Sequence, residues 1–363
     1  MTGGGRQAVR GSDAAPAGAA DFVAAGVNIV DVARRAGVSI STVSRTLRGS
    51  LNVSGDTRER VLRAAADLSY VPSPAASRLA SGRTRTIGVI VQFSARWFFA
   101  EVIRGAEGVL RASDYDLLLF NVGDPASRAH LFQTMPLRRR VDGVLAVATN
   151  FSESETTALT RLGVPLVIVG HQPGPSGAGV GIDDTESAAM AVRHLVLLGH
   201  VDIAMISGLP DDPIGRGTTL ARRAGFSAGL HAAGLPDRPD RIVSEPWGVE
   251  GGRRAMERLL TRPQLPTAVF AESDEMAFGA LRTLRRVGLE VPGAVSVIGF
   301  DDHELAPASD LTTIAQPAYE QGRLAAAMAL DLLTGNTDEV DQRLTLPTRL
   351  VVRGTTGPPR RDL

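Results

Sequence analysis

Hydrophobic residues recur at helical spacing once the chain has passed residue 27. Val32 and Ala33 place small apolar groups on one side of a first short helix, and Val43 and Leu47 share one side of a second. Gly37 stands where the first helix would end, because a chain leaving a helix often passes through a left-handed residue. This pattern predicts two short helices joined by a tight turn.

The stretch that follows predicts a third helix, from about residue 55 to residue 69. Ser39 is positioned to cap the second helix. Ser54, or the pair formed by Asp56 and Glu59, is positioned to cap the third. Apolar residues at helical spacing would complete a three-helix core: Val61, Leu62, Ala65 and Leu68. We therefore expect a small all-α unit.

From Thr86 the pattern changes to apolar runs of strand length that alternate with helical stretches. The strand candidates are 87–91, 116–120, 143–147, 166–169, 203–206, 268–271 and 295–300. The helix candidates are 98–112, 185–198, 218–233, 251–260, 274–287 and 319–333. Continuous apolar strands separated by helices are typical of parallel sheets covered on both faces. Because these strands are too many for one sheet, we expect two α/β lobes.

Composition agrees with a globular protein of more than one domain. A chain of 363 residues exceeds one typical domain, and 44% hydrophobic with 21% charged residues is ordinary for such a chain. No apolar run reaches the ~18 residues that a transmembrane helix needs. The first 27 residues, rich in Gly and Ala, lack the basic start and apolar core of a signal peptide. We expect a disordered tail and a cytoplasmic protein with no membrane partner.

Charge is distributed unevenly although the net charge is zero. Residues 1–85 carry 12 Arg against 6 Asp and Glu, a net charge of +6, and the remainder carries a net charge of −6. A basic head on an acidic body favours attraction of the head to phosphate groups. The sequence therefore points toward nucleic acid as a partner.

Little in the sequence suggests catalysis or a cofactor. The absence of cysteine excludes disulfides, thiolate metal sites and a cysteine nucleophile. Phosphate-binding loops, GxSxG and dinucleotide fingerprints are also absent. The carboxylates of Asp183, Asp274 and Asp301 could suggest metal or acid–base chemistry, but no histidine-rich ligand spacing accompanies them. We predict that the protein is not an enzyme and has no catalytic residue, metal site or cofactor.

The second predicted helix has a polar side that is not needed for packing in the core. Ser41, Arg45 and Arg48 fall almost opposite its apolar side, at about 100° per residue. Such a helix can enter the major groove of DNA, where short polar side chains reach base edges. An ordinary amphipathic hairpin is the alternative, and the flanking sequence argues against it.

Three short motifs in this region resemble the helix-turn-helix of the LacI/GalR family of bacterial transcription regulators. They are Asp31-Val32-Ala33, Ala36-Gly37-Val38-Ser39 and Thr42-Val43-Ser44-Arg45. The likeness continues through residues 53–90 and runs on to about residue 354. It implies an N-terminal all-α helix-turn-helix DNA-binding head and an α/β two-lobe, periplasmic-binding-protein-like effector domain.

The resemblance also implies a function. It points to a homodimeric, ligand-responsive transcription regulator, most often a repressor, that binds a palindromic operator in double-stranded DNA. A solute-binding protein with the same two-lobe body is the alternative. The missing export signal and the basic helical head argue against that alternative.

Residues that would contact DNA are implied by the same resemblance. In the second helix and the following loop they are Ile40, Ser41, Thr42, Arg45, Arg48, Asn52 and Ser54. The angular position of Ile40 leans toward the packing side. Residues 73–85 match a hinge helix that forms on operator DNA. Leu79 matches the leucine that the family wedges into the minor groove, where wedging bends the duplex.

Domain boundaries follow from the resemblance. The expected segments are a tail (1–27), a DNA-binding domain (28–72), a hinge or linker (73–85), an effector-binding and dimerisation domain (86–357) and a second tail (358–363). The expected lobes, joined by three chain crossings, are lobe one (about 86–182 plus 314–342) and lobe two (about 183–313 plus 343–357).

Effector-binding candidates lie near strand ends, because ligands of open α/β sheets bind beyond the carboxyl ends of the strands. Strand-end positions and the resemblance single out Trp97, Phe98, Arg222, Trp247, Ser273, Asp274, Asp301 and Gln316. Asp274 could equally cap the next helix. The donor fork of Arg222, the acceptor pair of Asp301 and an aromatic face suit a polyhydroxylated ring. We therefore expect a sugar or sugar derivative, with a nucleoside or nucleobase as the alternative.

One wall of this cleft departs from the family pattern. Gln92, Phe93, Arg96 and Trp97 stand where the family usually has a Pro-Asp…Asn-Pro-Phe-Phe pattern. Gly170 stands where many relatives carry an acidic residue. The effector of this chain therefore does not follow from the resemblance.

Overall fold

A computed structural model describes residues 27–47, 52–70, 83–170, 177–212, 215–335 and 342–360. The chain divides into two compact units, which we call the head (Met1–Gly82) and the body (Arg83–Leu363). Arg48, Leu79, nearly all of the expected N-terminal tail and most of the expected hinge lie outside the described residues.

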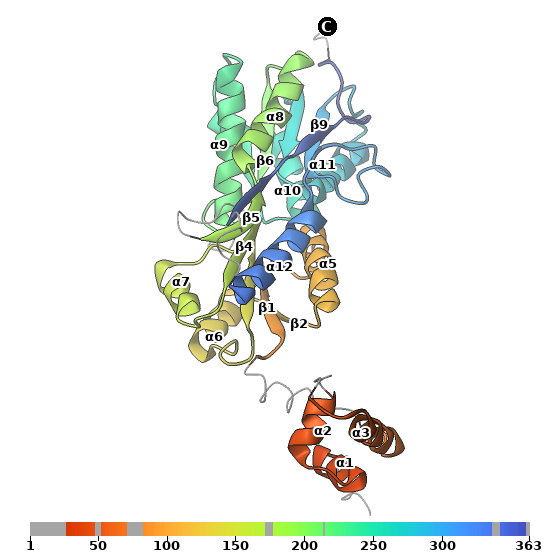
Figure 1. Cartoon of the computed structure of the whole chain (residues 1–363). Coiled ribbons are helices and arrows are strands. Elements are labelled where there is room, and N and C mark those ends of the chain that lie inside the picture. Colours follow the sequence, from red (N-terminus) through yellow and green to blue (C-terminus); the bar gives the residue numbers. More distant parts are fainter. Residues whose placement is uncertain are drawn as a thin grey trace, which may run out of the picture. The chain divides into compact units, whose positions relative to one another are not determined.

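The head consists of α1 (Ile29–Ala36), α2 (Ile40–Leu47) and α3 (Gly55–Asp67) (Figure 1). Asn28 caps the start of α1, because its side-chain oxygen accepts hydrogen bonds from the amides of Val30 and Asp31. In return, the Asp31 carboxylate accepts a hydrogen bond from the Asn28 amide. This reciprocal cap satisfies amides that a helix start otherwise leaves unpaired.

The turn between α1 and α2 has the predicted geometry. Gly37 ends α1 in the left-handed conformation, with φ at 67°. The Ser39 hydroxyl accepts a hydrogen bond from the Thr42 amide at 3.2 Å, which confirms the predicted cap of α2. The cap of α3 predicted at Ser54 does not form. The Ser54 hydroxyl donates to the hydroxyl of Thr57 and does not accept a hydrogen bond from a backbone amide of α3.

The three helices bury a small core. Its buried members are Val32, Ala33, Ala36, Val43, Val61, Ala64 and Ala65. The prediction that Leu62 belongs to this core is wrong, since its side chain is 49% exposed. Core positions on α3 follow the helical spacing i, i+3, i+4, which selects Ala64 and Ala65 after Val61 and leaves Leu62 facing outward.

Replacing Gly37 with alanine should destabilise the head by about 1–2 kcal/mol, because a side chain disfavours the left-handed conformation. Nothing lies within 4 Å of a methyl group added there, so the effect is one of backbone conformation alone. Gly55→Ala is the matched control, since its methyl group would also meet open space and its φ is not positive. Urea unfolding of the two variants tests this, and equal stability would contradict it.

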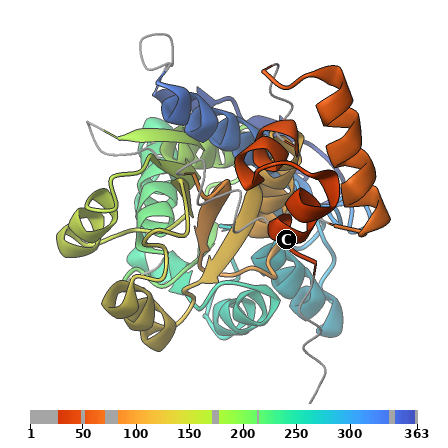
Figure 2. The same cartoon turned by 60° about the horizontal axis from the view of Figure 1, so that its bottom comes forward.

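The body contains two six-stranded sheets flanked by helices (Figures 1 and 2). Lobe one holds the first sheet, in the order β11 (Arg343–Leu346), β5 (Ala178–Ile182), β4 (Leu166–Gly170), β3 (Gly143–Val147), β1 (Thr86–Val91) and β2 (Asp116–Asn121). Its helices are α5 (Trp97–Ala112), α6 (Pro125–Thr134), α7 (Glu153–Thr160) and α12 (Ala318–Thr334). All of these strands pair in parallel.

Lobe two repeats this plan. Its sheet has the order β12 (Arg349–Val351), β10 (Thr312–Ala315), β9 (Ser296–Asp301), β8 (Ala268–Ala271), β6 (Ile203–Ser207) and β7 (Ile242–Ser244). Its helices are α8 (Asp184–Leu197), α9 (Arg216–Ala232), α10 (Val249–Leu260), α11 (Asp274–Arg286) and the short 3₁₀ helix η1 (Pro239–Arg241). Only the edge strand β12 is antiparallel to its neighbour, among the strands that the structure describes.

Two of the expected boundaries between the lobes are wrong, one by a whole strand and the other by part of a strand. Residues from 343 onward were expected in lobe two, but β11 pairs in parallel with β5 and therefore belongs to lobe one. Residues from 314 onward were expected in lobe one, but β10 pairs with β9 as far as Ala315. The strand pairing places the three chain crossings after β5, β10 and β11.

The C-terminal segment packs on lobe two, so the tail expected from residue 358 does not begin there. Arg360 donates hydrogen bonds to the backbone oxygens of Leu265 and Ala294, at 2.6 and 2.8 Å. Nε2 of the buried His200 lies 2.9 Å from the Gly357 oxygen, to which it donates in its neutral form. Burial lowers the pKa of His200, which keeps this ring neutral.

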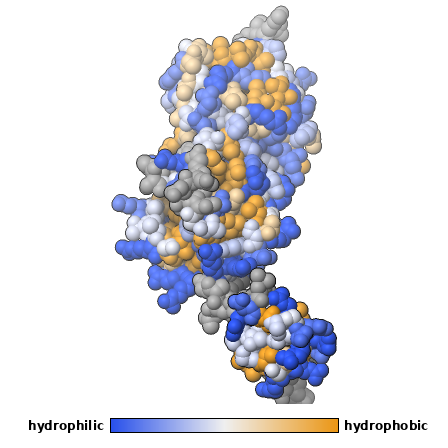
Figure 3. Space-filling model, viewed as in Figure 1, coloured by the Kyte–Doolittle hydropathy of each residue, from blue (hydrophilic) through white to orange (hydrophobic). Residues whose placement is uncertain are grey.

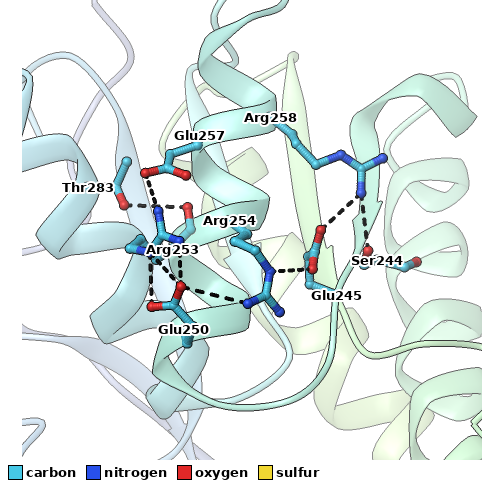
Figure 4. Close-up of polar contacts among 8 residues, drawn as sticks. All are labelled: Ser244, Glu245, Glu250, Arg253, Arg254, Glu257, Arg258 and Thr283. Carbon is cyan, nitrogen blue, oxygen red and sulfur yellow. Dashed lines mark hydrogen bonds and ion pairs between the residues drawn. The ribbon is translucent and has the colours of Figure 1, made fainter.

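Charged residues cover the outer side of α10 (Figure 4). Arg253 forms ion pairs with both Glu250 and Glu257. Arg254 and Arg258 both contact Glu245, at 2.9 and 3.2 Å. Exposed pairs of this kind contribute about 0–1 kcal/mol each, so the network orders the surface of α10 more than it stabilises the fold.

Apolar side chains are mostly inside the two units. On the face shown in Figure 3, apolar residues lie in scattered groups among hydrophilic ones. Of the helices described, none combines the length and the apolar character needed to cross a membrane.

Candidate nucleic-acid interface and ligand cavity

The exposed side of α2 carries hydroxyl groups, one guanidinium and one isoleucine. Arg45 and Ser41 are exposed, and the Arg45 Nη2 lies 3.4 Å from the Ser41 hydroxyl. Thr42, half-buried, contacts the Ser39 hydroxyl at 2.9 Å. Ile40 is 48% exposed, so it lies on this open side and not on the packing side. The arrangement presents polar groups at the helix start, where a groove-bound helix needs them.

The remaining DNA-contact candidates divide into two groups. Asn52 and Ser54 are exposed in the segment that leads into α3. Arg48 and Leu79 lie outside the described residues, so their roles stay predictions.

A cavity of about 80 Å³ lies in the body, between the carboxyl ends of the two sheets. Lobe one and lobe two both contribute to its walls. The residues that line it are Gln92, Phe93, Arg96, Trp97, Phe98, Phe99, Ala148, Gly170, Gly215, Thr218, Arg222, Trp247, Ser273, Glu275, Asp301 and Gln316. Seven of the eight effector-binding candidates therefore meet at one cavity.

Arg222, on α9, is the central cation of lobe two. Its Nε donates to Asp184 at 2.8 Å, and an Nη donates to the backbone oxygen of Glu272. The same Nη lies 4.0 Å from Oδ1 of Asp301, and the guanidinium carbon lies 3.6 Å from the centre of the Phe300 ring. The side chain is thus buried, paired and fixed in direction, as a preorganised ligand contact requires.

Asp301 ends β9 with its backbone at a φ of 127°, which side-chain-bearing residues rarely adopt. Its Oδ1 accepts a hydrogen bond from Nε2 of Gln316 at 2.6 Å. The Gln316 oxygen in turn accepts one from Gln321 at 3.1 Å. Burial raises the pKa of the Asp301 carboxyl, and the Arg222 charge opposes this rise. The chain of contacts joins the cavity to the crossing before α12.

Asp274 is the one effector-binding candidate that does not line this cavity. Its carboxylate accepts hydrogen bonds from the Thr313 hydroxyl at 2.6 Å and the His303 amide at 2.8 Å. Burial raises its pKa to about 6. The cap of α11 is Ser273, whose hydroxyl accepts from the Met276 amide at 3.3 Å. Asp274 therefore braces the loop after β9.

Several contacts around the cavity were not predicted from the sequence. Arg96 donates to the backbone oxygen of Trp247 at 2.6 Å and lies 4.0 Å from Glu275, so it links the two lobes. The ring of Trp97 lies 5.4 Å from that of His303 in the other lobe. Glu275 follows β8 by four residues and so shares the strand-end position of the candidates Ser273 and Asp274, whereas nothing local marks the Arg96 contact.

Glu272, directly after β8, is buried behind the cavity. Its carboxylate accepts hydrogen bonds from the Ser207 hydroxyl at 2.6 Å and the Gly208 amide at 2.8 Å. Burial raises the pKa of Glu272 to about 7. Because the pKa is higher in the folded state, this group stabilises the fold fully below its unfolded pKa, near 4.5. That contribution is lost as pH rises through about 7.

The variant Glu272→Gln should therefore differ from wild type by an amount that depends on pH. Between pH 5 and pH 8 the stability of wild type relative to the variant should fall by about 1–3 kcal/mol, since glutamine does not ionise. Urea unfolding at several pH values measures this difference. A difference that stays constant across the range would contradict the assignment.

Among the described residues, no group of three or more His, Asp or Glu side chains is arranged to hold a metal ion.

A three-helix head with an exposed polar helix, joined to two α/β lobes around a cavity, defines a class of ligand-responsive DNA-binding proteins. A model of bacterial regulatory proteins of the lacI family matches residues 28–73, and one of the periplasmic binding protein-like domain matches residues 192–356. The chain is 35% identical to catabolite control protein A of Priestia megaterium over 337 residues, 91% of this chain and 99% of that protein.

Solved structures agree with these matches. A complex of the transcriptional regulator CelR with cellobiose is 32% identical, with a TM-score of 0.68, and the match covers 91% of this chain and 100% of that one. A lac repressor dimer bound to operator and the anti-inducer ONPF is 26% identical, with a TM-score of 0.80, and the match covers 91% and 99%. The chain belongs to the LacI family of bacterial transcription regulators, and the resemblance seen in the sequence is confirmed.

Proposed function

We propose that this protein is a repressor that binds a palindromic operator as a homodimer and responds to a small effector bound in the body cavity. The observation that carries the proposal is the division of α2 into two sides. Val43 is fully buried, whereas Ser41 and Arg45 are exposed together with Ile40. Buried residues fix the helix in the head, and exposed ones remain available to base edges.

Dimerisation follows from the size of the head. One three-helix unit reads only a half-site, and a two-fold operator needs two such heads. The lac repressor of similar structure is a dimer bound to operator. The relatives of this chain are transcription regulators and not enzymes. We therefore propose that the cavity binds its ligand and does not catalyse a reaction.

The cavity favours a sugar or sugar derivative as the effector. Arg222 offers a fork of donors and Asp301 a pair of acceptors, which suits hydroxyl groups that both donate and accept. Trp247 adds a ring on which a sugar ring can stack. CelR of similar structure binds cellobiose. A nucleoside or nucleobase is the second candidate, because the same groups and rings fit it.

Arg45→Ala should reduce operator affinity by about 1–3 kcal/mol and relax the preference at one base pair, since a bidentate contact to a base would be lost. Arg58→Ala is the control. If Arg58, half-buried on α3, contacts phosphate, its loss should weaken all sequences alike and flatten the salt dependence by about one unit. Gel-shift titrations on operator variants measure both effects. Unchanged affinity and selectivity after Arg45→Ala would contradict the role of α2.

A further inference from the structure

The two lobes of the body touch across the cavity through side chains of the chain itself. We propose that Arg96 holds the two lobes closed in the absence of an effector, and we call its contacts with lobe two the latch. A ligand that fills the space between the lobes has to break the latch. The inference concerns a motion of the body and goes beyond the proposed function.

Arg96 is positioned by lobe one before it reaches across to lobe two. It directly precedes the first residue of α5. Its guanidinium carbon lies 4.2 Å from the centre of the Phe93 ring, which belongs to the same lobe. A cation held over an aromatic face is attracted to that face. Contact with Phe93 therefore limits the directions that the arginine side chain can take.

On lobe two, the guanidinium meets a backbone oxygen and a carboxylate. Its Nη2 donates a hydrogen bond to the backbone oxygen of Trp247 at 2.6 Å, and its Nε lies 4.0 Å from Glu275. Nη2 would also lie 3.7 Å from a methyl group built on Gly248, so it lies against the backbone of this loop. The Arg96 and Glu275 side chains are only 26% and 21% exposed. A partly buried, charge-assisted hydrogen bond therefore joins the two lobes.

Two further contacts between the lobes accompany the latch. The ring of Trp97, next to Arg96 in the chain, lies 5.4 Å from the ring of His303 on lobe two. Asn150, which follows β3, faces Gly217 in the first turn of α9. A methyl group built on Gly217 would lie 2.7 Å from the side-chain nitrogen of Asn150. The lobes are thus closed together at places well separated along the chain.

The space that remains between the closed lobes is small. The cavity has a volume of about 80 Å³, whereas pockets for small ligands typically measure about 300–1,000 Å³. Arg96 and Trp97 both line it. Room for a ligand of ordinary size arises when the lobes move apart, and this movement breaks the Arg96 contacts. Binding of such a ligand and closure of the latch therefore exclude each other.

The latch is strong enough to keep the body closed and weak enough to open. When the lobes separate, the guanidinium and the Trp247 oxygen both reach water, so opening costs the net value of one hydrogen bond to a charged group. That value corresponds to a factor of about 10–100 in the equilibrium between the closed and the open body. Removal of the guanidinium should therefore raise the open fraction about tenfold or more.

Labelling of a cysteine placed between the closed lobes measures the open fraction. Because the chain has no cysteine, Ser273→Cys introduces a single thiol. Ser273 lines the cavity and is 4% exposed. Fluorescein maleimide is too large for this cavity, so it should react when the lobes have separated. In the Ser273→Cys background, Arg96→Met should raise the labelling rate of the effector-free, full-length protein about tenfold or more.

Two further variants in the same background separate the latch from a general loosening of the fold. Arg104→Met is the matched control, because Arg104 also belongs to α5 but pairs with Glu101 of the same helix. It should change the labelling rate by less than about twofold. Arg96→Lys keeps a cation that can donate a hydrogen bond, so its rate should lie within about threefold of the background rate. Thermal denaturation verifies that each variant is folded.

Three results would overturn the inference. The first is a labelling rate in Arg96→Met that stays within about twofold of the background. The second is an equal gain in Arg104→Met, and the third is a background protein that reacts as fast as its urea-unfolded form. The experiment contains neither DNA nor effector, so its outcome is independent of the proposed function, which operator gel shifts test separately.

Discussion

Replacing Arg222 with methionine should lower the free energy of unfolding by about 3–5 kcal/mol, the cost of breaking a buried ion pair by removing one partner. Methionine has a similar length but cannot pair with Asp184, which the guanidinium contacts at 2.8 Å. Both side chains are almost fully buried. The variant would also lose the contact of Arg222 with the Phe300 ring.

The loss should be larger at high pH than at low pH. Burial already raises the pKa of Asp184, and Arg222 opposes that rise. Without the arginine this carboxyl would hold its proton more strongly in the folded state. Its stabilising contribution is then present at low pH and disappears as pH rises through the raised pKa. Urea unfolding at pH 5 and pH 8 measures both the loss and its dependence on pH.

Arg193→Met is the matched control for this experiment. Arg193 pairs with Glu186 at 2.7 Å, but the two side chains are 48% and 59% exposed. An exposed pair contributes about 0–1 kcal/mol, so the control should change stability little. Equal losses in the two variants would show that burial of the Arg222 pair is not what stabilises lobe two.

Asp301→Ala should reduce effector affinity by about 2–5 kcal/mol, roughly 30-fold or more, because a buried carboxyl group that forms hydrogen bonds would be lost from the cavity. Operator binding in the absence of effector should survive, since the two sites are coupled but separate. Calorimetric titration of an identified effector and operator gel shifts measure the two quantities. Asp301→Asn, which tolerates a positive φ better than alanine, separates loss of the carboxyl group from loss of the folded loop.

Asp302→Ala is the control for Asp301. Its carboxylate lies 2.6 Å from Arg353 and is not part of the cavity lining. Effector affinity should therefore change by less than about twofold. Equal effector affinity in wild type and Asp301→Ala would remove Asp301 from the set of effector contacts.

Local rules were sufficient for much of the head and of the sheets. The left-handed Gly37 and the capping Ser39 were predictable because each is fixed by its immediate neighbours. Buried strands such as β1 were predictable from continuous apolar runs. Leu62 was misplaced because apolar character alone does not say which side of a helix faces the core.

Features that depend on distant parts of the chain were not predictable from local pattern. The edge strand β11 has alternating half-buried residues, and only its pairing with β5 assigns it to lobe one. Helices α6 and α7 were missed, since each buries only one leucine, Leu131 or Leu159, and so lacks a clear apolar face.

In the cavity, too, features set by local sequence and topology were predictable, and features set by distant contacts were not. Residues at strand ends, such as Asp301, were found because topology brings strand ends together. Asp274 shares that position, but its carboxylate turns toward Thr313 and the His303 amide. The contact of Arg96 with the Trp247 oxygen joins two lobes and leaves no mark in either segment. Side-chain direction and contacts between lobes are therefore what the sequence did not reveal.

The central claim is that α2 reads a two-fold operator, and selection from a random pool of DNA duplexes by the full-length protein tests it most directly. The account predicts enrichment of a pseudo-palindrome with a CG-type step at its centre. A CG step is a pyrimidine–purine step, and such steps kink easily. Arg45→Ala should lose the base preference at one symmetric position of each half-site. Recovery of sequences without two-fold symmetry, or no enrichment at all, would contradict the account.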